Sequence, residues 1–180
     1  MQKYYCLFLD FKNMKRKFLL FVIPILAVTI FTSCLYKGTD KPQTLEEEMI
    51  LLTKYIWEIE GKGNKVDTTE LGVFYWVMKD GNGILYPKIG DTLIIKYDGY
   101  LIDGNLFNTS GNSTISYALE ENNDAIKGWN DGLKVIRQGS KVELIIPSTL
   151  GFGEKGGWNV PPNNTLIYII EMVNIKKKKD

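Results

Sequence analysis

Hydrophobic residues recur every three or four positions between residues 44 and 62, which predicts an amphipathic helix. Thr44 and Glu47 have the spacing of a capping box, so the helix is expected to begin just after Thr44. Its apolar stripe consists of Leu45, Met49, Leu52, Ile56 and Ile59. We expect this stripe to pack on the domain that follows. The alternative is a dimer seam, although one short helix makes a poor coiled coil.

From residue 66 onward, apolar and polar residues alternate in short runs that predict strands. The expected strands cover residues 73–79, 92–102, 114–119, 142–146 and 165–175. A glycine-rich loop at 147–162 separates the last two. Ile126, Trp129, Leu133 and Ile136 instead follow a helical spacing. Few helical residues among many antiparallel strands predict an α+β fold, with one sheet folded over one short helix.

The first 33 residues have the pattern of a secretory signal: a basic cluster at 15–17, an apolar run at 18–31 and a small residue before Cys34. Cys34 resembles the lipobox cysteine of bacterial lipoproteins, whose thiol receives a diacylglyceryl group. An uncleaved membrane anchor is the alternative, although the run is shorter than the roughly 20 residues that span a bilayer. Both place the folded part in the bacterial cell envelope, facing the periplasm, with inner and outer membrane left open. Met14 is an alternative start.

Five segments follow from these patterns. They are a lipoprotein-type signal peptide at 1–33, a tether at 34–43, the helix at 44–62, a domain at 66–176 and a basic tail at 177–180. We expect the tail to be a solvated end, with contact to anionic lipid as the alternative. Residues 1–33 hold five basic residues and one acidic residue, so their removal lowers the net charge from +1 to −3. An acidic body has no electrostatic footprint for nucleic acid.

The inventory of reactive side chains excludes many enzyme classes. The chain has no histidine, which removes histidine-based triads, imidazole metal ligands and imidazole proton shuttles. Its two cysteines, Cys6 and Cys34, both precede the predicted domain. No Ser-x-x-Lys pair, EF-hand spacing, dinucleotide fingerprint or P-loop is present. We therefore expect neither a hydrolase nor an enzyme that needs a metal or a cofactor.

Aromatic residues are the remaining candidates for chemistry. They come from predicted strands, the helix and the loop, and include Tyr97, Tyr100, Phe107, Tyr117, Trp129, Phe152, Trp158 and Tyr168. Filling a core is one explanation for them. However, Gly128 beside Trp129 favours a binding cavity, because glycine lets the backbone approach a ligand closely. An apolar cavity lined by aromatic side chains is the common form of a small binding site.

Seven short segments carry a more specific resemblance, in matching order and spacing. They are Ile89-Gly90-Asp91-Thr92, Lys96 to Asn108, Ala125-Ile126-Lys127-Gly128-Trp129 with Gly132-Leu133, Gly139-x-Lys141, Ile146-Pro147, Gly151-Phe152-Gly153 and Pro161-Pro162-Asn163-x-Thr165-Leu166. Over about residues 70 to 175 the chain resembles the FK506-binding-protein (FKBP) family of peptidyl-prolyl isomerases. With its signal and preceding helix, it is similar to the membrane-anchored bacterial branch, which includes gliding-motility-associated isomerases.

The resemblance implies a bent antiparallel sheet of about five strands wrapped round the short helix, with the 44–62 helix as an addition. It also implies that Trp129 is the floor on which a proline ring sits, and that the backbone N–H of Ile126 holds the substrate carbonyl. The implied catalytic residues are Tyr97, Phe107, Asn108, Ile126, Trp129, Phe152 and Tyr168. Further substrate-binding residues would be Tyr117, Ala125, Trp158 and Val160.

Isomerisation of Xaa-Pro bonds suits a chain without imidazole or thiol in its body, because a dry cavity disfavours the polar planar amide more than the twisted one. The expected partners are proline-containing polypeptides of the envelope, and the membrane through the lipid on Cys34. Two departures from the family predict weakened activity: Asn108 stands where an acid is usual, and Phe152 where a tyrosine is usual. A non-catalytic peptide-binding or chaperone module on the same fold is the alternative function.

Overall fold

The structure, a computed structural model, describes residues 43–120 and 126–178. The predicted signal peptide, the lipidation site Cys34 and the substrate-binding candidate Ala125 lie outside the described residues. Among the residues that are described, no helix combines the length and the apolar character needed to cross a membrane.

Seven strands of the described chain pair antiparallel in one sheet, in the order β1–β2–β6–β7–β3–β4, with β5 also paired to β3. They are β1 (Asp67–Thr68), β2 (Phe74–Lys79), β3 (Thr92–Leu101), β4 (Leu106–Thr109), β5 (Ile115–Ala118), β6 (Lys141–Ile146) and β7 (Leu166–Lys176). Because β4 and β5 follow each other along β3 and β1 has only two residues, the sheet is about five strands wide, as predicted. The short β4 was not predicted; it follows the turn at Gly104, whose φ is +90°.

The short helix α3 (Lys127–Leu133) lies close to β6 because two of its glycines face that strand. A Cβ at Gly132 would lie 2.5 Å from Leu144 Cδ1, and one at Gly128 would overlap Ile146 and touch Leu150. Gly128 therefore serves helix–sheet packing rather than the approach to a ligand that the sequence suggested. Trp129 and Leu133 of this helix are buried in the main core, with Ile136 just beyond its end.

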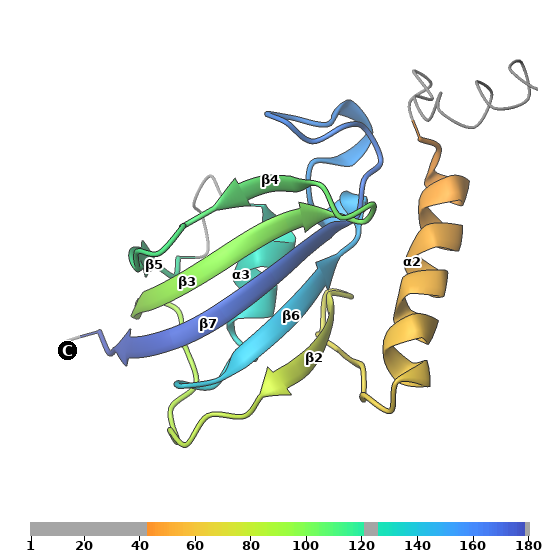
Figure 1. Ribbon diagram of the computed structural model, residues 1–180. Helices are drawn as coiled ribbons and strands as arrows, with labels where there is room; N and C mark the ends of the chain where they lie inside the picture. Colours follow the sequence, from red (N-terminus) through yellow and green to blue (C-terminus); the bar gives the residue numbers. More distant parts are fainter. Residues whose placement is uncertain (1–42, 121–125, 179–180) are drawn as a thin grey trace, which may run out of the picture. The chain divides into compact units, whose positions relative to one another are not determined.

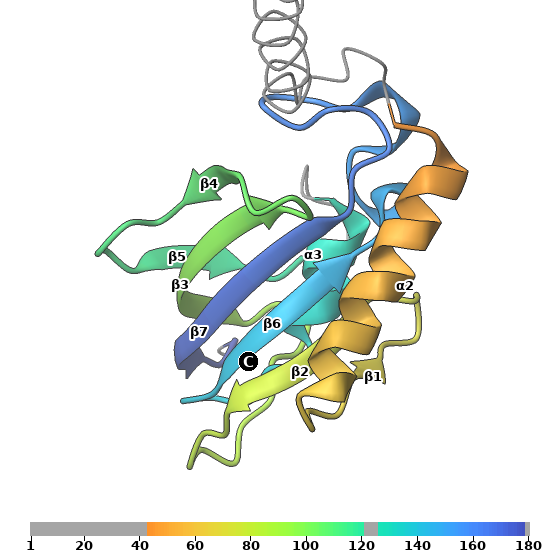
Figure 2. The ribbon, with the colours of Figure 1, turned by 45° about the vertical axis from the view of Figure 1, so that its right-hand side comes forward.

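The sheet lies between α3 and the longer helix α2 (Leu45–Gly61), as Figures 1 and 2 show together. Leu144 and Leu166 belong to the core that contains Trp129, whereas Ile145 and Ile167 pack with Leu52 and Ile59 of α2. Successive residues of a strand point to opposite faces, so the two cores lie on opposite sides of the sheet.

The start of α2 confirms the predicted capping box. The backbone N–H of Thr44 donates to Glu47 Oε2 at 2.8 Å, and the backbone N–H of Glu47 donates to Thr44 Oγ1 at 3.2 Å. The predicted apolar stripe is correct for Leu52 and Ile59 but wrong at its N-terminal end, where Met49 is 54% exposed. Leu45 is exposed as well, and the buried residue in this turn is Glu48. Hydrogen bonds, rather than apolar contacts, explain this exchange, because the Glu48 carboxylate has three buried donors around it.

The beginning of the basic tail stays exposed at residues 177 and 178, but it is hydrogen-bonded to the domain. The Lys177 ammonium donates to Asp91 Oδ2 at 2.9 Å, and the Lys178 backbone N–H donates to Asp91 Oδ1 at 3.1 Å. A third donor, the backbone N–H of Lys88, lies 2.7 Å from Asp91 Oδ2. Burial alone would raise the pKa of the Asp91 carboxyl, but these three hydrogen bonds outweigh burial and lower that pKa.

Asp91→Asn should lower the free energy of unfolding at pH 7 by about 1–3 kcal/mol, because it removes the ionised acceptor of three partly buried hydrogen bonds. A lowered folded-state pKa stabilises the fold above the unfolded-state pKa of about 3.9, and this contribution is lost as pH falls through the folded-state pKa. The difference between wild type and variant should therefore shrink between about pH 5 and pH 2. Urea unfolding across this range measures it, with Asp103→Asn as an exposed control. A difference that is constant with pH would contradict this role of the carboxylate.

Candidate active site

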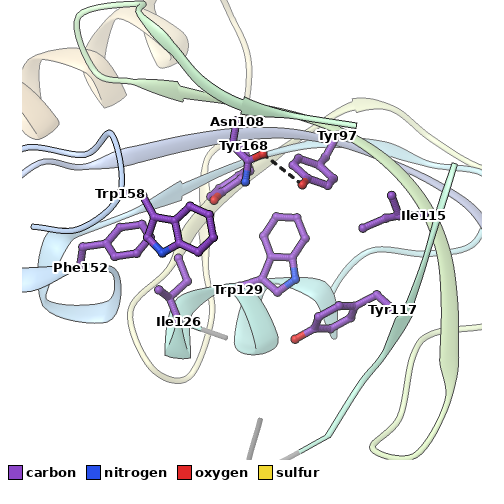
Figure 3. Close-up of a pocket in the computed structure, with 9 residues that line it drawn as sticks. All are labelled: Tyr97, Asn108, Ile115, Tyr117, Ile126, Trp129, Phe152, Trp158 and Tyr168. Carbon is purple, nitrogen blue, oxygen red and sulfur yellow. Dashed lines mark hydrogen bonds between the residues drawn. The ribbon is translucent and has the colours of Figure 1, made fainter. Parts of the chain in front are cut away.

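A cavity of about 250 Å³ opens between α3 and the sheet. Its lining residues are Tyr97, Asn108, Ile115, Tyr117, Ile126, Trp129, Phe152, Trp158 and Tyr168 (Figure 3). These residues come from β3, β4, β5, β7, the start of α3 and the connection between β6 and β7. The fold thus brings together residues that are up to 71 positions apart in the sequence, and eight of the nine are candidates from the sequence.

Trp129 forms the base of the cavity and contacts three other rings. Its ring centroid lies 4.6 Å from that of Tyr168, 5.3 Å from Tyr97 and 6.1 Å from Tyr117, each in an edge-to-face arrangement. Only 7% of Trp129 is exposed. Edge-to-face contacts add to the packing energy of each ring and restrict its orientation. The cavity therefore has a rigid, apolar base.

The polar side-chain groups of the described lining residues are hydroxyl, amide and indole N–H groups. Tyr97 Oη donates to Asn108 Oδ1 at 3.3 Å, so asparagine still accepts the bond that an acid at this position would accept. Tyr117 Oη donates to Asn130 Oδ1 on α3. Burial, with a smaller contribution from Tyr97, raises the pKa of the Tyr168 hydroxyl.

Among the described residues that line the cavity, none has a carboxylate or an amine. Within the described part of the chain, no three cysteine, aspartate or glutamate side chains lie together in a way that could hold a metal ion. The described side chains can therefore exclude water, hold a ring and orient hydrogen bonds, but they offer no pair for nucleophilic attack.

Two of the predicted residues, Phe107 and Val160, are not among the residues that line the cavity. Phe107 is partly buried and contacts Tyr168 edge-to-face at a centroid distance of 5.5 Å. Val160 is 4% exposed and belongs to the main core. Conversely, Ile115 lines the cavity and was not predicted. Its place two residues before Tyr117 in a predicted strand could have identified it, because residues i and i+2 share one face.

Comparison with known proteins decides the family. Residues 85–173 match the model of a family described as FKBP-type peptidyl-prolyl cis-trans isomerase. The chain belongs to the FKBP family.

Several FKBP relatives are similar to this chain. The isomerase FkpA of Escherichia coli (strain K12) is 38% identical over 117 residues, which cover 64% of this chain and 42% of FkpA. A probable FKBP-type isomerase of Haemophilus influenzae is 34% identical over 122 residues, 66% of this chain and 49% of that protein. This chain thus spans less than half the length of these curated relatives.

Solved structures agree with this assignment. The crystal structure of FkpA from Escherichia coli matches with a TM-score of 0.64 and 28% identity, over 96% of this chain and 76% of that one. A peptidyl-prolyl cis-trans isomerase from Pseudomonas syringae matches with a TM-score of 0.59 and 25% identity, over 78% of this chain and 100% of that one.

Trp158 is the most unusual residue of the FKBP domain. It is 97% exposed, yet it lines the cavity from the loop between β6 and β7 (Figure 3). Gly157 and Val160 exchange backbone hydrogen bonds of 3.0 and 2.9 Å, which leaves Trp158 in a two-residue turn with a φ of +55°. The left-handed region costs a residue with a Cβ about 1–2 kcal/mol. Backbone strain of this kind often occurs at functional sites, so a binding role of Trp158 is a hypothesis to test.

Trp158→Gly should separate the effect of backbone strain on stability from the effect of the indole on peptide binding. Glycine adopts a positive φ without steric cost, so the free energy of unfolding should stay constant or rise by up to about 1 kcal/mol. Loss of one aromatic contact should weaken the binding of a Leu-Pro tetrapeptide about 2- to 10-fold. Urea unfolding and a fluorescence titration measure the two effects. Trp57→Ala, which removes a 70% exposed indole from α2, is the control. Unchanged affinity in Trp158→Gly would contradict a role of this residue in binding.

Proposed function

We propose that the chain is a peptidyl-prolyl cis-trans isomerase that acts on Xaa-Pro bonds of polypeptides. The observation that carries this proposal is the buried indole of Trp129 at the base of an aromatic cavity whose described lining residues are all uncharged. The similarity to FKBP-type isomerases supports it.

The cavity can lower the rotation barrier through desolvation. Resonance makes the Xaa-Pro amide planar and polar, and the resulting barrier is about 18–20 kcal/mol. A twisted amide is less polar, so transfer from water into the cavity disfavours the planar ground state more than the transition state. Each 1.4 kcal/mol of this difference accelerates rotation about tenfold.

Each side chain then has a definite role in the proposed reaction. Trp129 receives the proline ring, and the rings of Tyr97 and Tyr168 close its sides against water. Ile126 caps α3 with an extended backbone, φ −59° and ψ 141°, at the edge of the cavity. Following the family resemblance, we propose that the backbone N–H of Ile126 donates a hydrogen bond to the substrate carbonyl. None of these roles needs a proton donor, a nucleophile or a cofactor.

Trp129→Leu should lower kcat/KM for Leu-Pro tetrapeptides about tenfold or more, since an apolar side chain remains but the flat floor is lost. A protease-coupled assay with the full chain measures this effect, and circular dichroism verifies folding. Trp57→Ala is again the control, because its indole lies on α2. A folded wild-type chain that gives no rate above the uncatalysed reaction would rule out the isomerase.

A non-catalytic peptide-binding module is the second candidate, favoured by the 97% exposure of Trp158 at the rim of the cavity. Such a module would grip apolar segments of unfolded clients. It would suppress client aggregation in a light-scattering assay while the wild type shows no isomerase rate. Suppression that disappears with Trp129→Leu together with the rate would argue for the enzyme.

We also propose that the protein acts on exported polypeptides in the cell envelope, anchored through a lipid on Cys34. The basic cluster, apolar run and small residue that precede Cys34 support this location. Labelled palmitate should enter the wild-type chain in a bacterial host and should be lost in Cys34→Ser. Incorporation that persists in Cys34→Ser would refute lipidation at this residue.

A further inference from the structure

Glu48 is a buried carboxylate that links α2 to the loop at the cavity. It is 2% exposed, although it stands on a helix surface with exposed neighbours. Its Oε1 accepts hydrogen bonds from the Ser148 backbone N–H at 2.7 Å and from Thr165 Oγ1 at 2.6 Å. Its Oε2 accepts from Ser148 Oγ at 2.5 Å. Ser148 and Thr165 are themselves 1% and 0% exposed.

These partners mark the two ends of one segment, the 147–165 connection between β6 and β7. Ser148 opens the 3₁₀ turn η1 (Ser148–Leu150) just after β6 ends, and Thr165 immediately precedes β7. One side chain on α2 therefore holds both ends of the connection. This same connection carries Phe152 and Trp158 to the cavity.

A second contact ties the start of α2 to the same segment. Asn163 Nδ2 donates to the backbone carbonyl of Gln43 at 2.6 Å, and Asn164 Nδ2 lies 3.4 Å from Gln43 Oε1. The backbone N–H of Asn163 in turn donates to the carbonyl of Gly153 at 2.9 Å. The contact at the helix start is thus continuous with the part of the connection that follows Phe152.

A buried glutamate at position 48 would destabilise the fold if its carboxylate had no hydrogen-bond donors around it. Burial of a carboxylate is unfavourable unless donors surround it, whereas Leu52 one turn later is packed by apolar contacts alone. A leucine at position 48 would leave the Ser148 N–H and two hydroxyl groups without this acceptor. The three hydrogen bonds therefore specify one arrangement of α2 and the connection.

We propose that Glu48 is a positioning residue for the cavity: it fixes the 147–165 connection so that Phe152 and Trp158 stand at the substrate. In this role α2 is part of the binding site without touching the substrate. The proposal extends the isomerase function and rests on it for the kinetic consequences only. If the connection samples other arrangements, apparent affinity falls by the fraction of molecules that remain competent. The effect is therefore expected in KM more than in kcat.

Three variants of the full chain test this role. Glu48→Ala removes the acceptor. Glu48→Gln restores it, because the amide oxygen can accept from the Ser148 N–H and Thr165 while the amide nitrogen donates to Ser148 Oγ. Tyr55→Phe is the matched control, since Tyr55 Oη donates to Glu143 at 2.9 Å and so ties α2 to β6 instead of the connection.

Two measurements report separately on the 147–165 connection and on the cavity. Amide hydrogen exchange reports on the hydrogen-bonded N–H groups of Gly151, Val160 and Asn163, with Ile95 of β3 as reference. Fluorescence titration with a Leu-Pro tetrapeptide and the KM of its isomerisation report on the cavity. In Glu48→Ala, loop exchange should accelerate and KM should rise about tenfold, because small displacements of positioning groups are worth up to about 100-fold. Glu48→Gln should restore both values, and Tyr55→Phe should change neither.

Wild-type protection and affinity in a folded Glu48→Ala would overturn the proposal, as would equal loosening in Tyr55→Phe. If Glu48→Ala does not fold, Thr165→Val decides instead, since it deletes one donor with little change of shape. It should accelerate loop exchange while Ile95 stays protected, and unchanged loop exchange would overturn the proposal. A wild type without isomerase activity would refute the proposed function alone, because exchange and peptide affinity still decide the role of Glu48.

Discussion

The close contact between α3 and β6 is the constraint on which the rest of the structure depends. Gly128 and Gly132 stand one helical turn apart and present no side chain to Ile146 and Leu144. The helix can therefore lie directly on the sheet, and Trp129 reaches the rings of Tyr97 and Tyr168. A bulkier residue at either glycine would lift the helix and with it the floor of the cavity. A packing requirement thus determines the geometry of the site.

Helix α3 packs on one face of the sheet and helix α2 on the other, and the connection between β6 and β7 links α2 to the cavity. One face holds the cavity, and the other receives α2 through Ile145 and Ile167. Where β6 ends and β7 begins, the buried carboxylate of Glu48 meets Ser148 and Thr165. Support for the rim of the cavity therefore comes from the side of the sheet opposite to the cavity itself.

The sequence predicted the features that depend on residues close together in the chain. The capping box at Thr44 and five of the strands followed from period and spacing, and the resemblance to FKBP isomerases implied eight of the lining residues. The sequence could not reveal the burial of Glu48 or the bonds of Asp91 to residues 177 and 178, because their partners lie 86 to 117 positions away. The prediction that Leu45 and Met49 pack on the domain was wrong because a helical period identifies an apolar face but does not identify which part of that face the sheet covers. The left-handed turn at Trp158 carries no signal either, since glycine is the residue that normally marks it.

The central claim is that the proline ring of a substrate sits on the indole of Trp129. The proton spectrum of a Leu-Pro tetrapeptide, saturated with the full chain, tests it most directly. The account predicts an upfield shift of the proline ring protons on binding, because the ring current of an indole shields protons that lie over its face. Proline protons that keep their free-peptide shifts in the saturated complex would contradict this claim.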